Sequence, residues 1–595
     1  MNLKQKRWLH GITVLLLGTS AYSQAYEYGK ESAPSNTGYQ STSPTSSYAA
    51  KVPADLDQGF SHELRLEWWY TSQGSRIIPY NWFLALERAD SEELFHSNEN
   101  LEQRLRYIAW PAHPRWNPDG LPIGFVADTD AKTGKTYIGV TCAACHTGKV
   151  EFDGKSVLIE GGPAHADFDR LISELTQSLQ ATLGDDKKFS RFANRVLGAK
   201  FDPSSISALK DEVKQATAPL AERSKIQHPP HPNGYARLDA FGNIFNEVAV
   251  FAINEPGNAK IVNAPVSYPV VWDAPHHDVV QWNGSAVNAG LGAYARNAGE
   301  VVGVFGDLHI KKVDVIDKEK LRYEHHINVK ALERLEALLT KLESPVWPEN
   351  ILPAIDKQKA ELGKQVYEKN CVSCHQPINR ADPNRHITAQ LIPVTAVGTD
   401  PTVAMNIATS ISKTGMLEGQ PTIPLTKFLP NPGIIDLFGP QALTPNVVGN
   451  GVLGVLRDEL GFVDFTRLLP EFVAASMKNV LVDNCDPRQQ GPICFKPPRY
   501  KARPLNGIWA SAPFLHNGSI PNLSELLKKP DQRVSKFNVG SWEFDPVNVG
   551  FSTVSGPSTS ELDTSLTNDS NRGHDYGTGL SESEKAELIE YIKTL

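Results

Sequence analysis

The sequence predicts a mainly α-helical fold with long, less regular insertions. Three segments support this prediction, because residues 167–183, 354–370 and 581–595 each place apolar side chains at helical spacing. The last of them has a clear start signal. Ser581 is followed three residues later by Glu584, which is a capping-box arrangement. Apart from the two short motifs described next, we find no internal repeat.

Two C-x-x-C-H motifs, at residues 142–146 and 371–375, are the most informative features of the chain. This spacing is typical of c-type haem attachment, in which two thiols bond the porphyrin and the histidine is the proximal iron ligand. A thioredoxin-like pair does not need the histidine, and a zinc site needs further clustered ligands. The sequence therefore predicts two covalently bound c-type haems. Their ligating residues are Cys142, Cys145, His146, Cys371, Cys374 and His375.

The order of segments suggests how the chain is organised. The predicted helices at 354–370 and 581–595 correspond to the two helices that cross in a cytochrome c fold. We therefore predict two cytochrome c-like haem domains, an N-terminal one at 65–345 with a large insertion and a C-terminal one at 346–595. Residues 26–64 begin with a stretch rich in Ser, Thr, Tyr and Gly and are expected to form a flexible lead-in.

The first 25 residues predict export. Lys4, Lys6 and Arg7 precede an apolar run at 8–17, which is shorter than the roughly 20 residues that span a bilayer. Cleavage after Ala25 would leave a periplasmic or secreted protein with no membrane span. It would also change the formal net charge from −8 to −11. A chain this acidic, with no basic stripe, is not expected to bind nucleic acid.

The two remaining cysteines, Cys485 and Cys494, flank a loop containing Pro and Gly. In an oxidising compartment a local disulfide is favoured over two free thiols. We expect its role to be structural.

A resemblance to a known family appears in the C-terminal region. Residues 502–519 resemble the "LRN…APYFHDGS" segment of bacterial di-haem cytochrome c peroxidases. Residues 282–284, Trp-Asn-Gly, resemble that family's Trp-Asp-Gly, where the tryptophan lies between the haems. Glu300 follows at a distance similar to that of the family's distal glutamate. The order of these motifs along the chain is also the same.

The chain departs from ordinary peroxidases in length and in having Asn283 and Asn517 where they usually have Asp. With Trp-Asp-x-Pro at 272–275 and Asn-Arg-Gly-His at 571–574, it resembles an enlarged branch of the family. That branch contains the rubber oxygenases and the di-haem fatty-acid dioxygenases that make hydroperoxides from oleate. The resemblance covers about residues 65–595 and implies two haem domains under a less regular cap.

The sixth iron position decides what each haem can do, because only an open or weakly ligated iron binds oxygen or peroxide. For the second haem we favour His574 as the sixth ligand. His516 is the alternative, although a hydrogen-bonding role near the haems suits it better. Met405 and Met416 are weaker candidates.

No strong ligand for the first haem is obvious. His165 is close in sequence but could simply lie at a helix start, and at most one of His276 and His277 could face the iron. In the oxygenase branch that the chain resembles, the N-terminal haem is the catalytic one. We therefore expect the first haem to be the reactive centre.

Other residues could assist the reaction. Trp282, or Trp272 as the second candidate, could carry electrons between the haems, although packing is the alternative. Glu300 could act as an acid or base if it were buried, because desolvation would raise its pKa. Arg237 and Asp239 could contact haem propionates, and a structural ion pair is an equal alternative.

Three functions remain open. The resemblance favours a haem-dependent oxidoreductase that adds O2 to a double bond of an apolar unsaturated lipid, either a fatty acid such as oleate or polyisoprene. A cytochrome c peroxidase, with a small c-type cytochrome as electron donor, is the alternative. A third possibility is an electron carrier with two six-coordinate irons.

Overall fold

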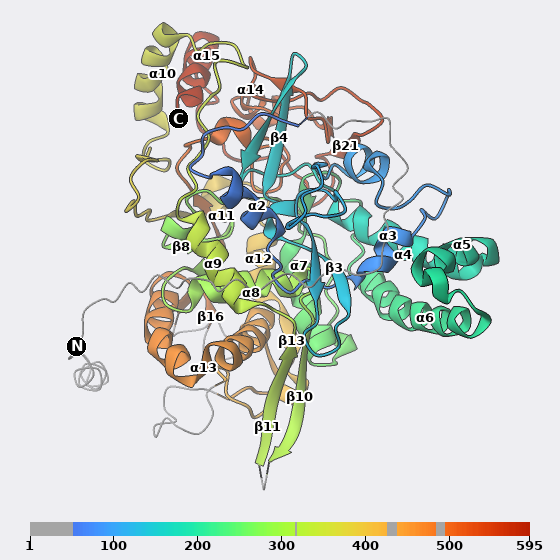
Figure 1. Cartoon of the computed structure of the whole chain (residues 1–595). Coiled ribbons are helices and arrows are strands. Elements are labelled where there is room, and N and C mark those ends of the chain that lie inside the picture. The colour runs from blue at the N-terminus through green and yellow to red at the C-terminus, as the bar shows by residue number, and fades with distance from the viewer. Residues whose placement is uncertain (1–51, 316–317, 425–436, 483–493) are drawn as a thin grey trace, which may run out of the picture. The chain divides into compact units, whose positions relative to one another are not determined.

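The computed structural model describes residues 52–315, 318–424, 437–482 and 494–595 (Figure 1). Helix accounts for 41% of the residues and strand for 16%, in many small sheets. The expectation of a mainly α fold is therefore wrong. Most of the strands were missed because they are two to five residues long, too short for an alternating pattern to be recognised.

The α-helices, apart from short 3₁₀ and π turns, lie at the following positions. They are α2 His62–Tyr70, α3 Tyr80–Ala85, α4 Phe168–Gly184, α5 Asp186–Leu197, α6 Pro203–Ile226, α7 Ala240–Asn246, α8 Gly292–Gly303, α9 Val329–Leu339, α10 Lys357–Asn370, α11 Val394–Val397, α12 Thr402–Thr409, α13 Thr444–Asn479, α14 Leu523–Leu526 and α15 Glu582–Lys593. Within α13, Gly461 has a non-helical backbone and marks a kink.

Within the part of the chain that the structure describes, the strands form antiparallel ladders. They are β1 Ile78–Pro79, β2 Phe125–Thr129, β3 Thr136–Val140, β4 Thr147–Phe152, β5 Lys155–Glu160, β6 Arg237–Leu238, β7 Val266–Ser267, β8 Val279–Val280, β9 Ala286–Val287, β10 Leu308–Val315, β11 Lys318–His325, β12 Gln390–Pro393, β13 Ile411–Lys413, β14 Gln441–Leu443, β15 Leu481–Val482, β16 Cys494–Phe495, β17 Arg499–Ala502, β18 Lys536–Val539, β19 Phe544–Asp545, β20 Gly550–Phe551 and β21 Ser560–Asp563. In the described part of the chain, β1, β3 and β2 form a three-stranded sheet and the other strands form pairs.

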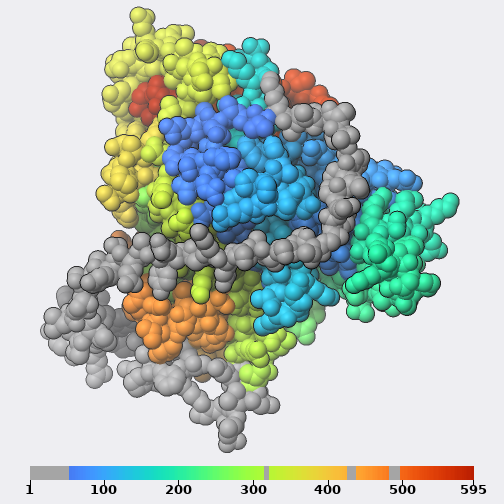
Figure 2. All heavy atoms as spheres, in the orientation of Figure 1, coloured from blue at the N-terminus to red at the C-terminus, as the bar shows by residue number. Residues whose placement is uncertain are grey.

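The three helices predicted from periodicity are confirmed. Helix α4 begins after Asp167, whose side chain accepts a hydrogen bond from the amide of Arg170. Helix α15 has the predicted capping box. Helices α10 and α15 pack so closely that a Cβ atom on Gly363 would lie 1.9 Å from the carbonyl oxygen of Glu587. Figure 2 shows α10, in yellow, beside α15, in red.

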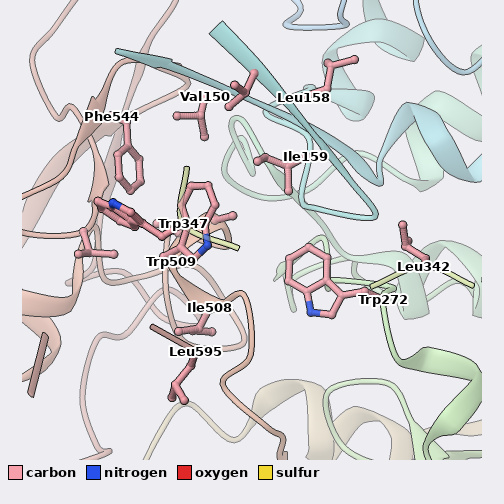
Figure 3. Close-up of a cluster of buried hydrophobic side chains, with 14 of the residues drawn as sticks. Val150, Leu158, Ile159, Trp272, Leu342, Trp347, Ile508, Trp509, Phe544 and Leu595 are labelled. Carbon is pink, nitrogen blue, oxygen red and sulfur yellow. The ribbon is translucent and has the colours of Figure 1, made fainter. Parts of the chain in front are cut away.

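One hydrophobic core joins the N-terminal and C-terminal halves of the chain. Its members include Trp272 and Trp347 together with Trp509 and Phe544 (Figure 3). Trp347 and Trp509 make an edge contact with ring centres 5.4 Å apart. Because this core is shared, the segments on both sides of the predicted domain boundary pack against each other. The boundary at residue 345 itself stays a prediction.

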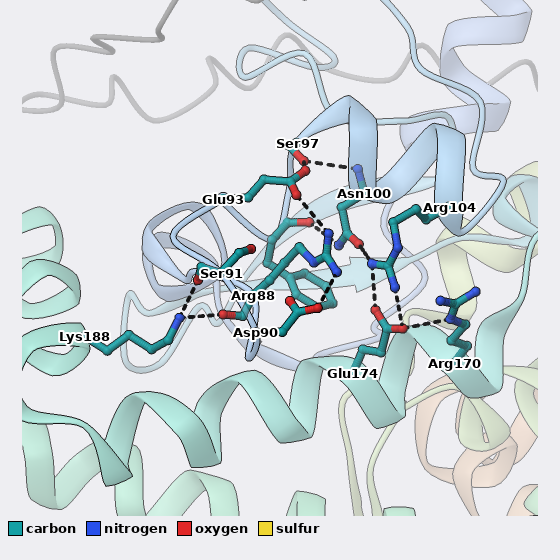
Figure 4. Close-up of polar contacts among 11 residues, drawn as sticks. Arg88, Asp90, Ser91, Glu93, Ser97, Asn100, Arg104, Arg170, Glu174 and Lys188 are labelled. Carbon is teal, nitrogen blue, oxygen red and sulfur yellow. Dashed lines mark hydrogen bonds and ion pairs between the residues drawn. The ribbon is translucent and has the colours of Figure 1, made fainter. Parts of the chain in front are cut away.

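Part of the long insertion after the first motif is a group of three helices, α4 to α6. Helix α4 is attached to the preceding segment by Arg104, whose guanidinium lies 3.0 Å from the carboxylate of Glu174 (Figure 4). The same carboxylate accepts from Arg170 at 2.7 Å. This ion-pair cluster orients α4, which begins close to the first attachment motif.

Three predictions lie wholly or partly outside the described residues: the export signal at 1–25, the flexible lead-in at 26–64 as far as residue 51, and the Cys485 partner of the disulfide. Among the residues that the structure does describe, no helix is both long and apolar enough to cross a membrane.

Candidate haem sites

The first attachment motif forms a single 3₁₀ turn between β3 and β4. The amides of Cys145 and His146 both bond the carbonyl of Cys142, at 3.2 and 2.9 Å. This tight turn brings the two thiols and the imidazole together. Burial raises the pKa of both cysteine thiols to about 12. The two thiols are thus neutral and protonated at neutral pH.

Both motif histidines are held in the orientation that an iron ligand needs. Nδ1 of His146 lies 2.8 Å from the carbonyl oxygen of Pro269, and Nδ1 of His375 lies 2.7 Å from that of Arg503. A carbonyl can only accept, so each Nδ1 carries the proton and each Nε2 keeps a free lone pair. Proximal metal-binding histidines typically have this arrangement. Two thiols and one oriented imidazole per motif therefore fit a covalently held haem.

A cavity of about 890 Å³, counting its mouth, lies beside the first motif. A porphyrin attached there would take up part of it. The apolar wall is formed by Trp68, Pro269, Val270, Val271, Trp272, Ala274, Val280, Trp282, Leu339 and Pro504. The polar wall is formed by Cys142, His146, Asp273, His277, Gln281, Arg296, Asn297, Glu300, Lys501 and Arg503.

Glu300 lines this cavity from α8. Burial raises its pKa, and the nearby Arg296 and a hydrogen bond from Gln281 partly offset the shift. The Gln281 amide donates to Glu300 Oε1 at 2.7 Å. The carboxyl group is thus positioned at the cavity wall with an elevated proton affinity. This is the property that an acid or base needs there.

Both candidate tryptophans line the same cavity, and each is tied to a different segment. The Trp282 indole donates to the carbonyl of Ser267 at 2.9 Å. The Trp272 indole donates to the carbonyl of Asn506 at 3.2 Å. Asn506 in turn exchanges side-chain bonds with the backbone of Ile378, three residues after His375. Trp272 is therefore connected to both motif regions, which the sequence did not reveal.

A cationic part of the wall was also missed by sequence reasoning. Lys501 and Arg503 project into the cavity at and just beyond the end of β17, and Arg296 projects from α8. The Arg503 guanidinium lies 5.4 Å from the ring centre of Trp282. The one sequence signal for this cationic wall was the two-residue spacing of Lys501 and Arg503. That spacing indicates only that both side chains project from the same face of a strand.

The second motif has a histidine facing its own. The ring centres of His375 and His574 lie 6.3 Å apart. One metal ion could bridge the two rings at bonds of about 2 Å each, the length usual for imidazole ligands. Burial lowers the pKa of His574 to about 4, so its imidazole is neutral and able to bind a metal. The His574 amide is anchored to the carbonyl of Val397 at 2.7 Å.

The chain can approach closely here because Gly573 lacks a side chain. Its φ is 75°, and a Cβ would lie 2.2 Å from the carbonyl carbon of Gly398.

The other candidates for the sixth ligand of the second haem lie elsewhere. His516 stacks on Tyr500 with ring centres 4.1 Å apart. Met405 is 41% exposed, and Met416 packs against a separate hydrophobic cluster.

Among the histidines considered for the first haem, only His277 lines the cavity. His276 points away, with Nε2 3.2 Å from the carbonyl of Thr340. His165 makes an edge contact with Phe551, with ring centres 4.2 Å apart. It lies in a different, smaller pocket.

Arg237 and Asp239 are buried but do not pair with each other. Arg237 forms an ion pair with Asp569. Asp239 caps α7, accepting from the amide of Gly242 at 2.8 Å, and it also accepts from the amide of Ala264 at 3.0 Å. Both residues thus have structural partners, and neither lines the cavity.

A comparison of the sequence with known protein families supports the interpretation of this chain as a haem protein. Residues 499–538 match the family model described as "RoxA-like, cytochrome c-like". The match covers the strand that carries Lys501 and the segment that contains His516. It implies a c-type haem and a haem-dependent oxidoreductase.

Two relatives come from Sinorhizobium fredii (strain NBRC 101917 / NGR234). The chain is 29% identical to uncharacterized protein y4iJ over 598 residues, which is 91% of this chain and 93% of that one. It is 25% identical to uncharacterized protein y4iM over 288 residues, which is 48% of each chain.

Proposed function

We propose that this protein is an exported di-haem dioxygenase that adds O2 to a carbon–carbon double bond of an unsaturated lipid at the N-terminal haem. One observation carries this proposal. The first motif opens onto a cavity lined by apolar and charged side chains, whereas at the second motif the ring centre of His574 lies 6.3 Å from that of His375. A ligand-binding centre needs such an open side, and an electron-transfer centre does not.

The residues around the cavity suit this role. The apolar wall, which includes Trp68, Val270 and Leu339, would hold a hydrocarbon chain and exclude water. A haem attached at residues 142–146 would supply the iron that binds and activates oxygen. His146, held by Pro269, would be its proximal ligand. His574 would close the second haem, which would then serve for electron transfer.

The reaction balances without an external reductant. With a fatty acid, one C–O bond forms, the O–O bond is kept, and a hydrogen from the lipid moves to the outer oxygen to give a hydroperoxide. With polyisoprene, the C=C and O–O bonds break and two carbonyl groups form. In either reaction both oxygen atoms of O2 enter the product.

The test is incubation of the purified holoprotein with oleate, and separately with polyisoprene, under isotopically labelled oxygen. We expect oxygen uptake and a product containing two labelled atoms with one of these lipids. A His146→Gly variant, which lacks the proximal imidazole, should lose this activity. Absence of labelled product with both lipids would overturn the proposal.

Peroxidase activity is a second candidate because Glu300, with its raised pKa, lines the same cavity as Trp282. In this reaction hydrogen peroxide takes two electrons and two protons and gives two waters. Electrons would come from a small c-type cytochrome, enter at the second haem and pass to the first. Peroxide-dependent oxidation of a reduced cytochrome, faster than lipid oxygenation, would favour this function.

A further inference from the structure

We propose that Lys501 and Arg503 form a carboxylate-binding site in the wall of the cavity. The carboxylate would belong either to a propionate of the first haem or to the head group of a fatty acid. Only the second source rests on the function proposed above. Both side chains line the cavity, and both project from the same short segment at the end of β17.

Acidic side chains lie near these two cations without forming an ion pair with them: Asp273 near Arg503 and Asp278 near Lys501. Among the described residues, neither side chain makes a hydrogen bond or ion pair; Arg503 has only the ring of Trp282, at 5.4 Å. The other arginines nearby are paired. Arg296 lies 2.6 Å from the carboxylate of Glu336, and Arg385 lies 2.5 Å from that of Asp273.

Lys501 and Arg503 are partly buried, and a cation held in such a place without an ion pair is costly, so an anion is expected to be supplied by a bound group. Arg offers a planar fork for two carboxylate oxygens, and Lys offers a compact point charge.

A third group on the same wall is also without a partner. His277 is 6% exposed and lines the cavity. Its Nδ1 is buried and has no hydrogen-bond partner among the described residues. Lys501 and Arg503 are both close enough to lower the pKa of His277 further. The three side chains therefore face one space and offer hydrogen-bond donors to one anion.

The experiment compares oleate with oleyl alcohol, which has the same chain but no charge. Binding to the ferric holoprotein is measured by calorimetry without oxygen, so that it does not depend on any reaction. In parallel, resonance Raman spectra record the propionate bands of the haems. The charge-removing variants are Lys501→Met and Arg503→Gln. Lys501→Arg and Arg503→Lys keep the charge, and Lys214→Met removes a charge on exposed α6.

If the site binds a fatty acid, oleate should bind at least about tenfold more tightly than the alcohol, and charge removal should abolish this preference. If it binds a propionate, the two lipids should bind alike, and the propionate bands should shift in Lys501→Met and Arg503→Gln only. The haem content of each variant shows whether that variant has folded. Lys501→Met is expected to disturb the fold less than Arg503→Gln, because the backbone of residue 501 does not contact His375. Wild-type lipid preference and unshifted bands in both charge-removing variants would overturn the proposal. Failure of lipid oxygenation would leave it standing.

Discussion

Nδ1 of His375 lies 2.7 Å from the carbonyl oxygen of Arg503, whose own guanidinium lines the cavity at the first motif. One residue thus contacts the motif histidine of the second candidate haem site with its backbone and lines the first candidate site with its side chain. The amide of Lys501, two residues earlier, also bonds the carbonyl of Trp282 at 2.7 Å. The segment from Lys501 to Arg503 therefore connects the two sites by covalent and hydrogen bonds.

The first prediction concerns the asymmetry of the two sites. His574→Ala should convert one haem from a low-spin six-coordinate form to one that binds carbon monoxide after reduction, because a strong-field imidazole is lost from that iron alone. Optical spectra of the reduced protein, with and without carbon monoxide, measure the change. His516→Ala is the matched control and should leave both spectra unaltered. The opposite result for the two variants would make His516 the ligand.

The second prediction concerns Glu300 in peroxide chemistry. Glu300→Gln should lower peroxide-dependent oxidation of a reduced cytochrome by about 100-fold or more, because an amide cannot accept a proton. Glu300→Asp keeps the acid and should retain more activity than Glu300→Gln. Steady-state rates measured over a range of pH would show this. Unchanged rates in Glu300→Gln would mean that the carboxyl takes no part.

The third prediction concerns stability in acid. Burial lowers the pKa of His165 to about 3 in the folded protein, from 6.5 when exposed. The unfolded chain therefore binds more protons at this residue, and stability falls as the pH is lowered from about 6.5 toward 3. At pH 5 the loss is about 2 kcal/mol.

Urea unfolding of the wild type and of His165→Leu at pH 7 and pH 5 tests this. The variant should lose less stability between the two pH values than the wild type, whatever its absolute stability. His62→Leu, at an exposed position on α2, is the control and should keep the wild-type difference. An unchanged pH dependence in His165→Leu would contradict the prediction.

The fourth prediction concerns the contact between α10 and α15. Gly363→Ala should destabilise the protein by about 1–3 kcal/mol, because its Cβ would meet the backbone of Glu587 at 1.9 Å. Gly449→Ala in α13 is the matched control, since no atom lies within 4 Å of its Cβ position. It should stabilise by up to about 1 kcal/mol, through helix propensity. Thermal unfolding of both variants, compared with the wild type, measures the two effects.

The attachment chemistry and the main helices could be predicted from the amino-acid sequence alone. Two thiols and a histidine in five residues form one turn wherever that segment lies, and helical periodicity located α4, α10 and α15, because both signals are local. Short resemblances to known motifs also pointed to Trp282, Glu300 and His574. The roles of these three residues remain predictions.

Which residues share a site depends on the three-dimensional packing of the chain and could not be predicted from the sequence. The cavity brings Glu300 together with Lys501 and Arg503, some two hundred positions later, and no periodic pattern encodes such a contact. The small sheets were missed for the same reason: β12 pairs with β17 across about a hundred residues, and each strand is only four residues long. Long-range pairing and burial set the charges, the pKa values and the free space at the site, and these depend on how the whole chain packs.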